Sequence, residues 1–165
     1  MDINQLPKGS RCFVDANILL YYLGGLSAEI REFLHRVIDE EIEAYINTVV
    51  VAEVLHRRMM AEAVASGIVT ISKVLNKLKA QPQLITQLSD YIVDLDDLLM
   101  VPLRVANVTL STINLSHHYR LSHGLFVNDS INLASAIELQ IADIVTNDRD
   151  FNRVPNIVVW SPTDI

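Results

Sequence analysis

The sequence predicts an α/β fold in which a central, mostly parallel sheet is flanked by helices in three layers. Short apolar runs of strand character alternate with longer runs at helical spacing. The connections between successive strands are long enough to hold the crossover helices that parallel strands need. No repeat, low-complexity tract or linker interrupts the 165 residues. We therefore expect one domain spanning residues 1–165.

The first half of the chain alternates strands with amphipathic helices. Ser27 is a typical N-cap, and the helix after it carries apolar residues at helical spacing. Gly24-Gly25 ends the helix before it. The expected elements are, in order, strand Arg11–Asp15, helix 17–23, a helix from Ser27, strand Glu43–Ile46 and helix Val49–Val64.

A mostly helical region, 68–99, then interrupts the alternation and is expected to be a helical insert broken at Gln81-Pro82. Its apolar residues are expected to be core, with part of them available as a homodimer face. The remaining expected elements are strand Val101–Val105, helix Leu110–Leu121, helix 129–141 and strands Ile144–Thr146 and Ile157–Trp160.

Composition limits the class of protein. A net charge of −7 argues against a broad basic surface that grips nucleic acid. The single cysteine, Cys12, cannot form an internal disulfide. No apolar stretch approaches the roughly 18 residues of a membrane span, and the N-terminus lacks the pattern of a signal peptide. We expect a cytoplasmic protein with no membrane partner.

Four acidic residues stand at the edges of core-forming segments. Asp15 ends the first strand, and Asp148 follows the strand Ile144–Thr146. Asp129 opens a helix, and Glu53 lies inside the apolar helix Val49–Val64. Ligands of open α/β sheets bind outside the carboxyl ends of the strands, where the strand order reverses. The sequence therefore predicts that these four carboxylates converge on one site.

Such a cluster is typical of a site for Mg²⁺ or Mn²⁺, which prefer oxygen ligands. A bound ion of this kind can activate water and stabilise the leaving oxygen in phosphodiester hydrolysis. Each acid alone also has a structural interpretation. Asp15 and Asp129 could be helix N-caps, Asp148 and Asp150 turn residues, and Glu53 part of an exposed helical face.

A resemblance to PIN-domain nucleases covers nearly the whole chain. It begins at Val14-Asp15-Ala16-Asn17-Ile18-Leu19-Leu20 and continues at Glu53, which follows the helix start Asn47-Thr48. It then includes Asp129, before an alanine-containing helix, and ends with the run Thr146-Asn147-Asp148-Arg149-Asp150-Phe151.

This resemblance implies a Mg²⁺- or Mn²⁺-dependent endoribonuclease similar to VapC toxins. Its substrate would be RNA, and its partner would be a cognate antitoxin of a type II toxin–antitoxin pair. It implies a site in which Asp15, Glu53, Asp129 and Asp148 are catalytic and bind metal, Asp150 is an accessory metal-binding acid, and Asn17 and Thr146 support Asp15.

Two features of the sequence differ from the pattern of compact VapC-like toxins and leave other functions open. The region between Glu53 and Asp129 is long for a compact toxin, and ten residues precede the first strand. The alternatives are a PIN-scaffold RNA-processing nuclease outside a toxin pair and a non-catalytic interaction module. Asn17 argues against a haloacid-dehalogenase-type phosphatase, which needs an aspartate at that position.

Overall fold

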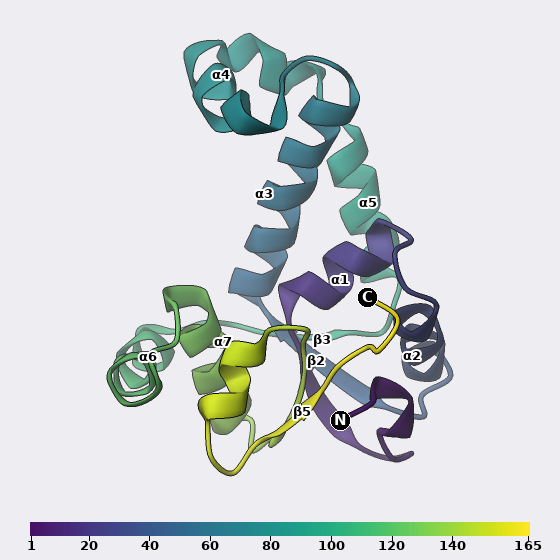
Figure 1. Ribbon diagram of the computed structural model, residues 1–165, viewed down its shortest axis with the longest axis vertical. Helices are drawn as coiled ribbons and strands as arrows, with labels where there is room; N and C mark the ends of the chain where they lie inside the picture. The colour runs from purple at the N-terminus through teal and green to yellow at the C-terminus, as the bar shows by residue number, and fades with distance from the viewer.

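The computed structural model describes residues 1–165 and confirms the predicted α/β architecture. A parallel sheet of five strands has the order β3-β2-β1-β4-β5. Helix α2 lies to one side of this sheet, and α6 and α7 lie to the other (Figure 1). The strands are β1 (Arg11–Val14), β2 (Glu43–Asn47), β3 (Arg104–Ala106), β4 (Asp143–Val145) and β5 (Val158–Trp160).

The helices form where the sequence provides caps and apolar faces. Ser27 caps its helix as predicted, because its Oγ accepts a hydrogen bond from the Ile30 amide at 3.0 Å. The α-helices are α1 (Ala16–Leu23), α2 (Ala28–Ile38), α3 (Thr48–Ala65), α4 (Val74–Ala80), α5 (Asp90–Leu99), α6 (Leu110–His123) and α7 (Val127–Glu138). Short 3₁₀ helices are η1 (Ile3–Gln5), η2 (Ile71–Lys73), η3 (Pro82–Gln87) and η4 (Arg149–Arg153).

The order of the strands reverses at β1. The chain passes from β1 to β2 and β3 on one side, then returns to β4 and β5 on the other. Val14 and Val145 are paired at the ends of β1 and β4. The residues that follow these two strands, Asp15 and Thr146, are therefore neighbours in the crevice where such sheets bind ligands.

The predicted helical insert, 68–99, contains α4 and α5, and together with α3 it forms an arm that has α4 at its tip (Figure 1). The tip has its own apolar cluster of Ala63, Val69, Leu78 and Leu88, separate from the main core. The expectation that the insert's leucines are core is only partly right, because Leu75 is 44% exposed whereas Leu78 is 3% exposed.

Two predicted boundaries were wrong. The strand expected at Val101–Val105 forms only at Arg104–Ala106, because the Val101 amide still bonds to Leu98 in the last turn of α5 and Pro102 has no amide to donate. The helix expected to open at Asp129 begins two residues earlier and ends at Glu138, short of the expected 141.

The residues before β1 cover the β5 edge of the sheet. The Ser161 amide donates to the carbonyl oxygen of Met1 at 2.7 Å, and the Ile3 amide donates to that of Ser161 at 3.0 Å. Ile3 and Leu6 are buried in the main core. This extension therefore occupies backbone groups that an open edge would expose. No helix in the fold has both the length and the apolar character of a membrane span.

Candidate functional site

Asp15 is buried at the carboxyl end of β1, where it is only 6% exposed. Its Oδ1 accepts hydrogen bonds from the Ala16 amide at 2.8 Å and from Asn132 Nδ2 at 3.1 Å. Its Oδ2 accepts from Asn17 Nδ2 at 2.7 Å and from Thr146 Oγ1 at 2.8 Å. Asp15 is thus the N-cap of α1, as one interpretation of the sequence held. Its carboxylate also accepts from three side chains, so four donors in all hold it in one orientation.

Thr146 connects the ends of β1 and β4. Its Oγ1 donates to Asp15 and accepts from the Asp148 amide at 3.0 Å. Asn17 Nδ2 also lies 3.0 Å from this hydroxyl, while Asn17 Oδ1 accepts from the Asn147 amide at 3.2 Å. The position of the loop that carries Asp148 is therefore tied to the position of Asp15.

Asp129 lies in the first turn of α7, three residues past the N-cap position at Phe126, so its N-cap interpretation was wrong. Burial, followed by the charges of Asp148, Glu53 and Asp150, raises the pKa of Asp129 to about 6. The contributions of these three charges to the raised pKa place their carboxylates near enough to Asp129 to repel it.

The pKa of Asp15 is likewise raised to about 6, mainly by burial and further by the charges of Asp129 and Glu53. The hydrogen bonds from Thr146 and from the Ala16 amide act in the opposite direction. Because burial outweighs these donors, the ionised carboxylate of Asp15 lacks a compensating cation.

Glu53 and Asp148 face the same region from opposite sides of β1. Glu53 is half-buried on α3, and its Oε2 accepts from Asn128 Nδ2 at 2.8 Å. Asp148 caps η4, because its Oδ1 accepts a hydrogen bond from the Asp150 amide at 2.9 Å. The interpretation of Asp148 as a turn residue therefore agrees with this local hydrogen bond. The Asp150 carboxylate forms an ion pair with Arg153.

The five acids thus belong to one electrostatic cluster, but no three acidic, histidine or cysteine side chains converge closely enough to hold a metal ion as they stand. The donor set consists of carboxylate oxygens, which suit Mg²⁺ and Mn²⁺. The uncompensated charge at Asp15 and Asp129 suits a cation as well. Coordination by three of these carboxylates would require their side chains to move closer together.

A buried amide chain behind Asp15 was not predicted from the sequence. Asn47 Nδ2 donates to Asn132 Oδ1 at 3.0 Å and to Ser135 Oγ at 2.9 Å, while Asn47 Oδ1 accepts from the Val50 amide at 2.8 Å. Asn132 in turn donates to Asp15, so Asn47 helps to fix the orientation of the Asp15 carboxylate. The sequence feature that could have indicated Asn132 is its place within the apolar run of α7. It follows Asp129 by three residues and so lies on the same helical face.

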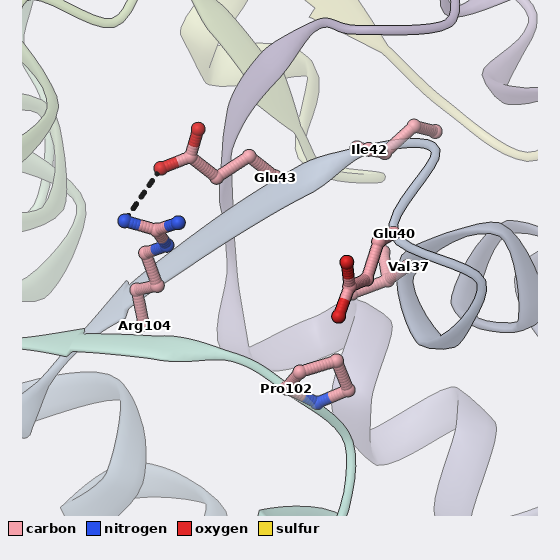
Figure 2. A pocket seen from close by; sticks show the side chains of 6 residues that line it. All are labelled: Val37, Glu40, Ile42, Glu43, Pro102 and Arg104. Carbon is pink, nitrogen blue, oxygen red and sulfur yellow. Dashed lines mark ion pairs between the residues drawn. The ribbon is translucent and has the colours of Figure 1, made fainter.

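A separate cavity of about 290 Å³ lies at the opposite end of the strands. Figure 2 shows Glu43 and Arg104 forming an ion pair across it, with Nη1 and Oε1 2.9 Å apart. These residues begin β2 and β3, whereas the acids follow the carboxyl ends of their strands. This cavity contains none of the predicted site residues and is not a candidate for the reaction.

The fold and the acidic cluster together define a parallel α/β domain with a carboxylate site where the strand order reverses. A family model described as the PIN domain matches residues 12–157. The chain belongs to the PIN domain family, as the sequence motifs indicated.

Relatives of known identity share the fold over most of their length. Ribonuclease VapC2 of Methanocaldococcus jannaschii is 25% identical over 146 residues, covering 88% of this chain and 89% of the relative. The structure of VapBC2 from Rickettsia felis, bound to a DNA fragment from its promoter, superposes with a TM-score of 0.61 at 17% identity, covering 92% of this chain and 98% of that one. VapC20 of Mycobacterium tuberculosis, a toxin that cleaves the sarcin–ricin loop, superposes with a TM-score of 0.54 at 14% identity, covering 86% of this chain and 92% of that one.

Proposed function

We propose that this protein is a Mg²⁺- or Mn²⁺-dependent endoribonuclease that hydrolyses RNA phosphodiester bonds, and that it is the toxin of a type II toxin–antitoxin pair. The observation that carries the proposal is the buried, donor-held Asp15 at the reversal of strand order, with Glu53, Asp129 and Asp148 around it. Membership of the PIN family and the similarity to Ribonuclease VapC2 support it.

The proposed metal-binding residues are Asp15, Glu53, Asp129 and Asp148, with Asp150 as an accessory. A bound divalent ion would lower the pKa of an attacking water and stabilise the leaving oxygen. The chain itself supplies orientation. Asn17 and Thr146 fix Oδ2 of Asp15, and the Thr146 hydroxyl also fixes the backbone next to Asp148.

Cleavage of RNA by the purified protein tests the enzyme assignment. We expect cleavage with Mn²⁺ or Mg²⁺, none with a chelator, and none from Asp148→Asn. Asp96→Asn is the matched control, because Asp96 is an exposed acid on α5 that forms no ion pair. Undiminished metal-dependent cleavage by Asp148→Asn and Asp15→Asn would refute the assigned site. Absence of cleavage under every metal condition would favour a non-catalytic module.

The antitoxin assignment is tested separately. Structures of toxin–antitoxin complexes from Rickettsia felis and Klebsiella pneumoniae share this fold. We infer a small DNA-binding partner, encoded beside this chain, that inhibits cleavage by inserting a side chain or helix into the acidic groove. Co-purification with the product of the neighbouring gene, and loss of cleavage in the complex, would support it. An active nuclease without such a neighbour would favour an RNA-processing enzyme.

We also infer a homodimer that uses the exposed apolar residues of α5. Ile92 and Val93 are 48% and 57% exposed in a helix whose Leu98 is buried. Light scattering should give a dimer for the wild type and a smaller mass for Ile92→Glu. A monomeric wild type would refute this inference without affecting the nuclease assignment.

A further inference from the structure

Few basic side chains of the chain are free to bind a ligand near the acidic cluster. Of its thirteen lysines and arginines, six form ion pairs, and the Arg120 guanidinium is held by the hydroxyls of Ser116 and Ser130. The six that remain are Arg31, Arg57, Lys73, Lys77, Lys79 and Arg149. Only Arg57 and Arg149 among them line a cavity together with one of the four acids.

Arg57 lines a groove of about 490 Å³ along α3. Glu53, His56, Arg57 and Met60 follow the spacing i, i+3, i+4, i+7 and so share one face of the helix. Asn128 lines the same groove and donates to Glu53, which joins the groove to the acidic cluster. The spacing of Glu53 and Arg57 would allow an ion pair, but Glu53 is bonded to Asn128 instead, and Arg57 remains exposed.

Arg149 lines a second hollow, of about 310 Å³, together with Asp148. Helix α3 follows β2, whereas Arg149 follows β4, and these strands lie on opposite sides of β1. The two arginines therefore flank Asp15 in the order of the sheet. Each is exposed and free of an internal ion pair that a ligand would have to break.

We propose that an unpaired RNA strand crosses the acidic cluster with one flanking phosphate bound by Arg57 and another, on the far side, bound by Arg149. This inference rests on the proposed function, because it names the flanking subsites of the same reaction. A protein of net charge −7 needs local cations to bring a phosphodiester to a group of carboxylates. A guanidinium matches phosphate by donating two parallel hydrogen bonds.

The residues that line the groove along α3 are also suited to bind a nucleobase. Val49, Ala52 and Met60 supply apolar contact, and the exposed His56 ring supplies a flat surface for stacking. Bases present their faces in this way only when they are unpaired. The groove therefore fits a single strand better than a duplex.

Binding of RNA in a chelator, which prevents cleavage, tests this inference independently of activity. The probe is a fluorescein-labelled pool of single-stranded RNA twelve nucleotides long, titrated with wild type, Arg57→Ala, Arg149→Ala and the double variant over a range of salt. We expect each single variant to weaken binding about 5- to 10-fold and to reduce the slope of log affinity against log salt by about 0.7. Arg57→Lys should keep most of the salt slope. Arg31→Ala, which removes an exposed unpaired arginine on α2, should match the wild type.

The outcomes separate this inference from the proposed function. Wild-type cleavage combined with unchanged affinity, salt slope and KM in Arg57→Ala and Arg149→Ala would overturn the subsites and leave the nuclease standing. Equal binding of a duplex probe would overturn the unpaired-strand assignment. A wild type that neither binds nor cleaves RNA would overturn the proposed function and this inference together. Unchanged melting temperatures in the variants confirm that they remain folded.

Discussion

Asn132 donates a hydrogen bond from its side-chain amide to Oδ1 of Asp15 at 3.1 Å, although 117 positions separate the two residues in the chain. Asn132 is 1% exposed, and its own carbonyl oxygen accepts from Asn47 at 3.0 Å. Three elements, β1, α7 and the start of α3, therefore meet through amides and a carboxylate. The orientation of Asp15 thus depends on a residue whose side chain is hydrogen-bonded to no other predicted site acid.

Asn132→Leu should lower the free energy of unfolding by about 2 kcal/mol, because it leaves a buried Asn47 donor without an acceptor at Asn132 and removes one donor from Asp15. Urea unfolding measures this change. Asn114→Leu is the matched control, since Asn114 is exposed on α6 and its side chain forms no hydrogen bond. Equal stability of the two variants would show that the amide chain contributes nothing.

The metal-free protein should lose stability as the pH rises from about 4 to 6. Asp15 and Asp129 have raised pKa values of about 6, against an ordinary value of 3.8. Between these two values the folded state keeps protons that the unfolded state has released, so unfolding becomes easier as the pH increases. For Asp15 the full effect is about 3 kcal/mol.

Asp129→Asn isolates one contribution to this effect, since the amide carries no charge at any pH in the window. Its melting temperature should rise relative to that of the wild type between pH 4.5 and 7.5, in a chelator. Glu41, Glu62 and Asp164 have lowered pKa values, so the stability they contribute is lost only at more acidic pH. A difference between variant and wild type that does not depend on pH would contradict the prediction.

Mn²⁺ should stabilise the folded protein, because a cation compensates the buried negative charge, and then the repulsion between carboxylates, that raise the pKa values of Asp15 and Asp129. At 100 times its dissociation constant the ion would add about 2.7 kcal/mol. For a chain of this size, this corresponds to a rise in Tm of roughly 5–10 °C. Differential scanning fluorimetry with millimolar-range Mn²⁺ measures it.

Asp148→Asn should reduce this metal-induced rise, and Asp96→Asn should not, because Asp96 lies on α5 outside the acidic cluster. A wild-type Tm that does not respond to Mn²⁺ or Mg²⁺ would count against a metal site. An equal response in both variants would remove Asp148 from the proposed ligands.

The order of the elements and the placement of the candidate acids at the ends of strands and helices were predictable, whereas the details that depend on distant partners were not. Asp15 could be placed because an apolar run ends at it, and the carboxyl end of a parallel strand is a known ligand position. The role of Asn132 could not be predicted, because it depends on a hydrogen bond with Asn47, which is 85 positions away in the chain. The start of β3 was missed because the last turn of α5 continues into Val101.

The tip of the arm should unfold independently of the sheet. Its cluster of Ala63, Val69, Leu78 and Leu88 is small and separate from the main core. Leu78→Ala removes a side chain that is 3% exposed, at a cost of about 2–4 kcal/mol. Because the cluster is small, this loss of stability should unfold the tip locally. Residues 66–89 should then exchange their amide hydrogens faster, while β1 and β4 remain protected.

Leu75→Ala provides the control on the same helix, because Leu75 is 44% exposed and its truncation removes little buried area. Hydrogen exchange measured by mass spectrometry compares the two variants with the wild type. If the tip unfolds alone, Leu78→Ala should leave the response to Mn²⁺ unchanged, since Glu53 lies near the start of α3, away from the tip cluster, and the other acids lie outside the arm. Faster exchange in β1 and β4 would instead show that the arm and the sheet unfold as one cooperative unit.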